Sequence, residues 1–177
     1  MHWECPLLTS LHIKCTFSFT AAYVPRTAWI INATPRDNVV FGEPENEERF
    51  REIIQACCLE PDLEMPPDGE HTEIGEKSSN LSGGQNSRES LSCATYSGTE
   101  IVFMDDALSA IESYVGKRLL NNCLLRGPLA DKTRAFVTHA LHLLVKTLYI
   151  YVMDEGVIVE QATYFVSSGI VFPGIAS

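Results

Sequence analysis

The 177-residue sequence contains no apolar run that approaches the roughly 18 to 20 residues of a membrane-spanning helix. Basic residues are scarce: the sequence has 13 Lys and Arg but 23 Asp and Glu. Its net charge is therefore −10. This charge opposes attraction to phosphates, so the composition argues against a nucleic-acid partner. The six cysteines include no CxxC pair, which favours buried, reduced thiols over a disulfide framework. No membrane-spanning segment and no nucleic-acid partner are therefore expected.

Short apolar segments alternate with helical patterns along the chain. Residues 46–59 place four apolar side chains at helical spacing behind Asn46, a favourable N-cap. Residues 61–80 are rich in Pro, Gly and acids and predict a loop with at most a turn or two. Helices are also expected at 112–125 and 140–145, and strands at 21–24, 101–103, 133–138, 148–153 and 157–160, with a hairpin turn at 154–156. This alternation predicts an α/β fold with a parallel sheet.

The first candidate site is the stretch LSGGQ, which stands in front of an expected helix and consists of Leu81, Ser82, Gly83, Gly84 and Gln85. Glycines at a helix start expose backbone N–H groups at the positive end of the helix dipole. The Ser82 hydroxyl adds a donor, so the arrangement can bind an anion. A Ser-Gly-Gly sequence is also common in turns and helix caps. These residues alone do not distinguish an anion site from an ordinary cap.

The second candidate site follows two expected strands. The apolar stretch IVFM ends in Asp105 and Asp106, which places two carboxylates at the carboxyl edge of a parallel sheet, where ligands bind in such folds. One carboxylate can hold Mg²⁺ while its neighbour polarises an attacking water. His139 follows the strand at 134–138 and reaches the same edge if the strands are parallel. The alternative interpretation is structural: the two aspartates end a strand in solvent, and His139 is an ordinary surface residue.

These pieces occur together with the phrases AYVPRTAWIINATPRDNVVFG, CCLEPDLE, EIGEK, IVFMDDALSA and YVMDEGVIVEQATY. The sequence thereby resembles the nucleotide-binding domain of ATP-binding cassette (ABC) transporters. These stretches are similar to the first such domain of the multidrug-resistance-associated (C) subfamily. The resemblance implies a partial domain at 21–164, between divergent segments at 1–20 and 165–177. The implied fold is a partial P-loop NTPase (RecA-like) parallel sheet with an α-helical subdomain that carries LSGGQ.

The resemblance implies a role for each matching residue, with ATP and Mg²⁺ as cofactors. Residues 81–85 match the signature that closes over ATP held by a partner domain, and Arg26 stands at the nucleotide-sensing Q-loop position. Asp105 matches the magnesium ligand, Asp106 the catalytic carboxylate and His139 the switch histidine. The implied partners are a second nucleotide-binding domain and the transmembrane domains of an exporter, at the cytoplasmic face of a membrane.

Several features depart from the family pattern. No G-x-x-x-x-G-K-[S/T] string, whose backbone wraps phosphates, occurs anywhere in the sequence. Arg26 replaces a glutamine, and its guanidinium repels Mg²⁺ although it can pair with a phosphate. Pro35 falls within a short helix, and Glu89 lies on the signature helix, where burial of an unpaired carboxylate is costly. Because the family's phosphate-loop strand lies inside the sheet, its loss predicts an unpaired strand edge.

Two functions from different classes fit these residues. In the first, the chain is part of an ATPase domain that couples ATP binding and hydrolysis to export across a membrane. In the second, it is a non-catalytic remnant or interaction module that offers its LSGGQ face to a partner cassette. The sequence leaves open whether the chain is an enzyme by itself, since the missing loop supplies most of the phosphate contacts.

Overall fold

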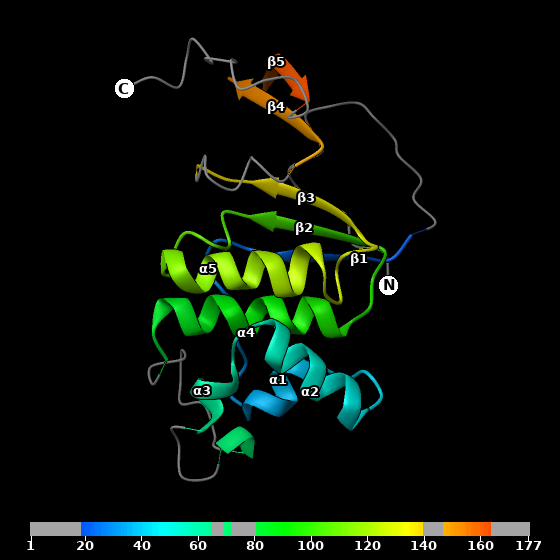
Figure 1. The fold of residues 1–177 in the computed structure, drawn as a ribbon, viewed down its shortest axis with the longest axis vertical. Coiled ribbons are helices and arrows are strands. Elements are labelled where there is room, and N and C mark those ends of the chain that lie inside the picture. Colours follow the sequence, from blue (N-terminus) through cyan, green and yellow to red (C-terminus); the bar gives the residue numbers. More distant parts are fainter. Residues whose placement is uncertain (1–18, 65–68, 72–80, 140–146, 164–177) are drawn as a thin grey trace.

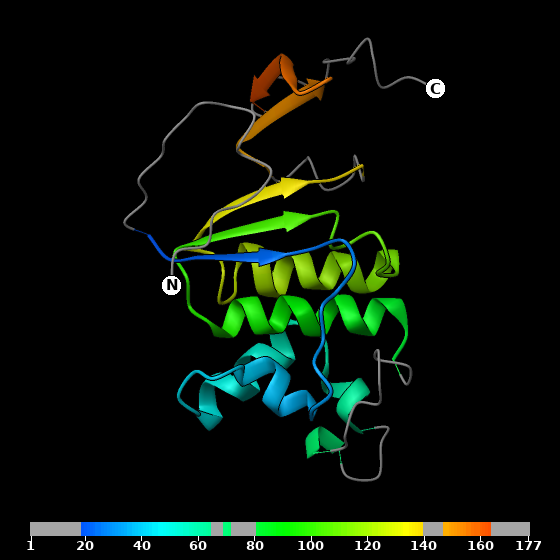
Figure 2. The ribbon, with the colours of Figure 1, turned by 180° about the vertical axis from the view of Figure 1, so that it is seen from behind.

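The computed structural model describes residues 19–64, 69–71, 81–139 and 147–163. Strands β1 (Ala21–Val24), β2 (Ile101–Asp105) and β3 (Thr133–Val137) form a parallel sheet in the order β1-β2-β3. Helices α4 (Gly83–Tyr96) and α5 (Ser113–Leu119) lie side by side next to this sheet, and the smaller helices lie beyond α4 (Figure 1 and Figure 2). The expected α/β class with a parallel sheet is confirmed.

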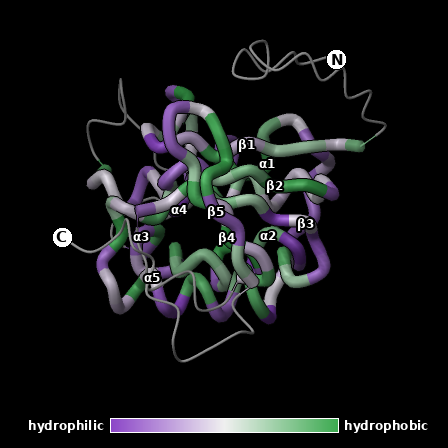
Figure 3. Tube along the Cα trace, turned by 90° about the horizontal axis from the view of Figure 1, so that it is seen from above, coloured by the Kyte–Doolittle hydropathy of each residue, from purple (hydrophilic) through white to green (hydrophobic). Residues whose placement is uncertain are grey.

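The register of the sheet determines which side chains are buried. Ala21 pairs with Ile101, and Ile101 pairs with Thr133, so the three strands run level with one another. One face buries Val24, Val102 and Met104 against the helices. The strands β1 and β2 accordingly appear mainly in the hydrophobic colour in Figure 3. The other face carries Tyr23, Phe103 and Val137, which are all exposed.

The first helix, α1 (Pro35–Val40), begins in a capping box. The Thr34 hydroxyl accepts a hydrogen bond from the Asp37 N–H at 3.1 Å, and the Asp37 carboxylate accepts one from the Thr34 N–H at 3.3 Å. Pro35 occupies the first helical position, where its missing N–H removes no helical bond and its fixed φ favours the helix. Pro35 is therefore compatible with the start of this helix.

Helix α2 (Glu47–Ala56) has the predicted N-cap, because the Asn46 side chain accepts from the Arg49 N–H at 2.9 Å. It ends three residues before the predicted boundary. Cys58 adopts a left-handed backbone with φ of 57°, which stops the helix. The predicted loop then contains α3 (Glu60–Glu64) and a 3₁₀ turn, η2 (Gly69–His71), in agreement with the expected turn or two.

The predicted helix at 112–125 forms, but in two hydrogen-bonding patterns. Helix α5 is followed directly by η4 (Leu120–Leu125), which is a π-helix. Its side chains Cys123 and Leu124 are buried in the core. The core gathers side chains from α1, α2, α4, α5, η4 and the sheet, and its large members include Phe50, Ile53, Leu91, Tyr96 and Leu119. No helix in the described residues is long and apolar enough to cross a membrane.

Strands β4 (Tyr149–Asp154) and β5 (Val157–Thr163) form a separate antiparallel hairpin. Glu155 and Gly156 in its turn both have positive φ, 45° and 81°, as the tight turn favoured between antiparallel strands requires. The hairpin was predicted, and β5 extends three residues beyond its predicted end. In the described residues no strand pairs with the outer edge of β3 or of β1. The predicted helix at 140–145 and the segments 1–18 and 164–177 lie outside the described residues.

Candidate functional site

The two candidate sites lie on the same side of the molecule. The strands β1, β2 and β3 end on the side where α4 and α5 begin, which both views in Figure 1 and Figure 2 show. Carboxyl ends of parallel strands and amino ends of helices are the parts of an α/β fold that meet ligands. The carboxylates after β2 and the LSGGQ stretch before α4 therefore face one region.

The LSGGQ stretch forms a capping box at the start of α4, with Ser82 as the N-cap. The Ser82 hydroxyl accepts from the Gln85 N–H at 3.2 Å, and the Gln85 side-chain oxygen accepts from the Ser82 N–H at 2.7 Å. The Gln85 side chain thus serves the cap, while Ser82 and Gly83 remain exposed and Leu81 is half-buried. The N–H groups of Gly83 and Gly84 come before the first helical hydrogen bond, from Asn86 N to Ser82 O, so they can face an anion.

Gly84 allows the loop after β2 to approach the signature closely. A Cβ on Gly84 would meet the Ala110 carbonyl oxygen at 3.0 Å, whereas a Cβ on Gly83 would meet the Ala110 Cβ at an ordinary 3.7 Å. Gly84 is therefore needed for packing. The loop from Asp106 to Ile111 joins the acidic edge of the sheet to the signature, which links the two candidate sites physically.

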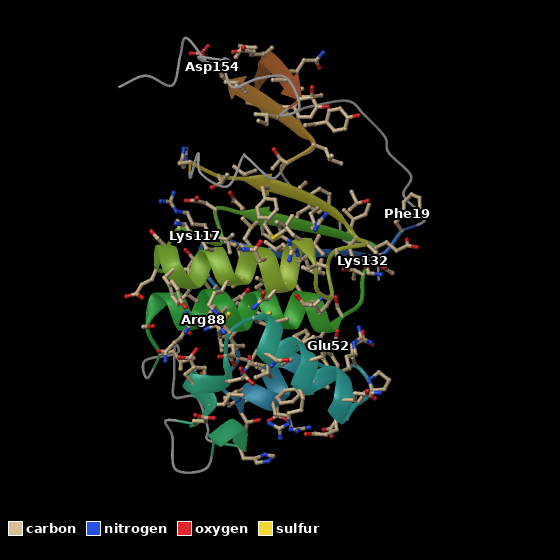
Figure 4. The ribbon with its side chains drawn as sticks, in the orientation of Figure 1. Phe19, Glu52, Arg88, Lys117, Lys132 and Asp154 are labelled. Carbon is tan, nitrogen blue, oxygen red and sulfur yellow. The ribbon has the colours of Figure 1, made fainter. Side chains whose placement is uncertain are left out.

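Asp62 of α3 fixes the signature helix from outside. Its carboxylate accepts from the Gln85 side-chain nitrogen at 2.9 Å and forms an ion pair with Arg88. Both charged side chains are nearly buried, with 14% of Asp62 and 12% of Arg88 exposed. Figure 4 shows Arg88 near the start of α4. The sequence interpretation did not include Asp62 in the site, although the phrase PDLE contains it, because its partners lie 23 and 26 residues away.

Asp105 ends β2 and is bound by a neighbouring strand. The Tyr23 hydroxyl donates to Asp105 Oδ2 at 3.1 Å, although the two residues are 82 positions apart. They meet because Tyr23 pairs with Phe103 in the sheet. Tyr23 is thus a site residue that sequence reasoning missed, and the only signal for it is its position in a strand that ends at the same edge.

Asp106 lies in a tightly held backbone turn. Its φ of 48° is left-handed, a conformation that aspartate adopts more readily than most residues. Its N–H donates to the Val137 carbonyl at 2.7 Å, and its own carbonyl accepts from the Ser109 hydroxyl at 2.7 Å. The side chain is 8% exposed and lies 3.5 Å from Arg26 Nε. A nearly buried carboxylate is thereby paired with a largely exposed guanidinium.

His139 is exposed and follows β3 by two residues. Because β3 is parallel to β2, His139 reaches the same sheet edge as the two aspartates, as the sequence predicted. Over residues 19–64, 69–71, 81–139 and 147–163, no group of three or more His, Cys, Asp or Glu side chains could hold a metal ion. Arg26 beside Asp106 places a positive charge where a divalent cation would approach that carboxylate.

Glu89 of α4 confirms the expectation of a buried carboxylate on the signature helix. It is 4% exposed, and its Oε1 atom makes no hydrogen bond within the described structure. Burial, together with the nearby Asp62 charge, raises the pKa of Glu89 to about 7. The carboxylate therefore opposes folding when it is charged.

Comparison with known proteins finds similar sequences among ATP-binding cassette proteins of sub-family C. The chain is 46% identical over 158 residues to human ATP-binding cassette sub-family C member 2, and 44% identical over 147 residues to ABC transporter C family member 8 of Dictyostelium discoideum. It is also 44% identical over 151 residues to multidrug resistance protein fer6 of Mycosarcoma maydis. These alignments cover 82% to 89% of the chain but only 9% to 11% of each relative. The chain thus spans about a tenth of their length, and no protein-family model matches it.

Proposed function

Because the chain belongs to sub-family C of the ATP-binding cassette proteins, we propose that it serves as the signature-bearing part of a cassette. In this role the start of α4 closes over the phosphates of ATP that is held by a phosphate loop on another domain. The binding of ATP then draws the two domains together, and this movement is coupled to export by transmembrane domains at the cytoplasmic face of a membrane.

The observation that carries the proposal is the free start of α4. This 14-residue helix begins at Gly83, so the N–H groups of its two glycines lie at its positive end, and Ser82 and Gly83 are exposed there. A phosphate is the natural occupant of such a helix end. The capping box and the Asp62 contacts hold the helix start in one conformation before a ligand arrives, which lowers the ordering cost of binding.

The rest of the nucleotide has to be held by other residues. The sequence has no phosphate loop, and a phosphate loop supplies most of the grip on the β and γ oxygens. The exposed Tyr23, Phe103 and Val137 side chains leave one face of a parallel sheet uncovered, although such sheets are normally covered on both faces. We assign this face and the outer edge of β3 to a further segment of the same cassette, which is distinct from the partner domain whose phosphate loop meets the signature.

Asp105, Asp106 and His139 form the acidic edge that would face the phosphates in a completed domain. In that setting His139 is positioned to donate to a terminal phosphate, and Asp106 to orient water. The ion pair between Asp106 and Arg26 favours the second candidate function, a signature module that binds without hydrolysis at its own acidic edge. ATP-dependent association with a partner cassette is common to both candidates, and ATP hydrolysis distinguishes them.

The test is association of the full 177-residue chain with a separate sub-family C cassette that has an intact phosphate loop. Association is measured by fluorescence anisotropy with and without ATP. Gly83→Asp places a carboxylate at the first helical position, where acids favour the helix but repel phosphate, and the Cβ has room there. Gln55→Glu adds the same charge to the exposed side of α2 as a control.

We expect ATP to strengthen association at least about tenfold for the natural chain and for Gln55→Glu, and to have little effect for Gly83→Asp. Removal of one phosphate contact from a closed site costs about this much. The proposal would be contradicted if association were equally strong with and without ATP. It would also be contradicted if Gly83→Asp left the effect of ATP on association unchanged. Hydrolysis above that of the partner alone would select the ATPase over the non-hydrolytic module.

A further inference from the structure

Arg26 and Asp106 meet where two neighbouring strands end. Arg26 lies two residues beyond β1, and Asp106 follows β2 directly. The Nε atom of Arg26 lies 3.5 Å from Oδ2 of Asp106. The side chains differ strongly in exposure, with 68% of Arg26 and 8% of Asp106 open to solvent. The guanidinium therefore covers the carboxylate from the solvent side.

Buried charges in proteins are paired with an opposite charge or coordinate a metal ion. Arg26 places a positive charge beside Asp106. The neighbouring Asp105 accepts a hydrogen bond from the Tyr23 hydroxyl through Oδ2. Both carboxylates of the acidic edge thus have partners within the chain itself, one charged and one neutral.

The charged partner, Arg26, opposes the approach of a divalent cation. Mg²⁺ requires oxygen ligands in near-octahedral geometry, and a guanidinium offers only donors and a like charge. We infer that Arg26 takes the place of the divalent cation at this edge, so that Asp105 and Asp106 do not bind Mg²⁺ and an incoming phosphate meets the guanidinium instead. The planar N–H groups on the exposed side of Arg26 suit phosphate oxygens.

This inference concerns the acidic edge alone and does not depend on the proposed role of the signature. Its test measures cation binding, whereas the test of the proposed function measures ATP-dependent association. The inference and the proposed function can therefore be contradicted separately.

The test uses Mn²⁺ as the probe, titrated into the full chain without nucleotide. Electron paramagnetic resonance measures free Mn²⁺, and paramagnetic broadening of amide signals at residues 105–107 and 137–139 locates any bound ion. Arg26→Gln removes the charge, and Arg26→Lys keeps it. Lys132→Gln removes a charge at the opposite end of the sheet, as Figure 4 shows, where Lys132 pairs with Asp131 at 3.6 Å.

We expect Arg26→Gln to gain one saturable Mn²⁺ site at these amides, at least tenfold tighter than any binding by the natural chain, Arg26→Lys or Lys132→Gln. Asp105→Asn in the Arg26→Gln background should abolish the new site. Equal broadening at these amides in the natural chain and in Arg26→Gln would overturn the inference, as would Arg26→Gln with no new site. Tight binding by Arg26→Lys would also overturn it, and this variant keeps the test valid if Arg26→Gln fails to fold.

Discussion

The thiol of Cys57 at the end of α2 donates to Cys123 of the π-helix, with the two sulfur atoms 3.8 Å apart. Both side chains are inaccessible to solvent, and the Thr95 hydroxyl lies 3.7 Å from the Cys123 sulfur. This cluster joins three helices in the core. The hydrogen bond to Cys123 and burial hold the pKa of Cys57 well above its usual range.

Cys57 should consequently react slowly with thiol reagents while the chain is folded. Alkylation requires the thiolate and access to solvent, and the fold denies both. We expect iodoacetamide at pH 8 to modify Cys57 at least about tenfold more slowly in the native chain than in urea. Mass spectrometry of the same peptide under both conditions gives the comparison, and equal rates would contradict the buried position.

Glu89→Gln should stabilise the chain at high pH only. Burial raises the pKa of Glu89 from 4.5 to about 7, so the folded state holds a proton that the unfolded state releases between these values. The stability contributed by this proton is complete below pH 4.5 and is lost as the pH rises through 7. The variant should gain little at pH 4.5 and about 3 kcal/mol at pH 8 in urea unfolding. Glu52→Gln, on the exposed face of α2 (Figure 4), is the control. A gain in unfolding free energy that does not depend on pH, or an equal gain from the control, would exclude burial of the Glu89 charge as the cause.

Asp62→Ala should weaken the start of α4 and the fold as a whole. The substitution leaves Arg88 charged and nearly buried, and removes the acceptor of Gln85. Loss of one partner from a buried pair costs about 3 kcal/mol, and hydrogen exchange should accelerate at residues 83–88. The matched control is Asp131→Ala, whose carboxylate is 76% exposed beside Lys132 and should change stability by less than about 1 kcal/mol. Similar losses in both variants would contradict the assignment.

Tyr96→Phe tests the contact between α4 and the entry to α2. The Tyr96 hydroxyl accepts from the Asn46 N–H and donates to the Pro44 carbonyl, both at 2.9 Å, and its ring is fully buried. Loss of the hydroxyl leaves both backbone groups without this partner, at a cost of about 1 to 3 kcal/mol. Tyr114→Phe is the control, because Tyr114 is exposed and should be neutral in thermal unfolding. No difference between the two variants would contradict the role of the hydroxyl.

The sequence predicted the parts of the fold that depend on local patterns. The strand at 21–24, the Asn46 cap and the hairpin turn at 154–156 follow from short-range chemistry and form as expected. The meeting of Asp106 and His139 at one sheet edge followed from parallel pairing. Their chemical roles remain proposals.

Contacts between distant residues were not predictable in this way. Tyr23 reaches Asp105 across 82 residues, and no pattern within either strand specifies the other. The ion pair between Arg26 and Asp106 was not predicted either, and it forms because the ends of β1 and β2 lie side by side. The π-helical turn at 120–125 also escaped prediction, since its apolar spacing is that of an ordinary helix.

The pairing of Ala21 with Ile101 has a consequence for how the chain is made. At about 5 to 20 residues per second, a ribosome completes β2 roughly 4 to 16 seconds after β1. Closure of so long a loop is entropically costly and slows the pairing of the strands. The helices α1, α2 and α4 emerge in this interval and can pack around Phe50 and Leu91. Translation speed between residues 25 and 105 therefore sets how long β1 waits for its partner β2.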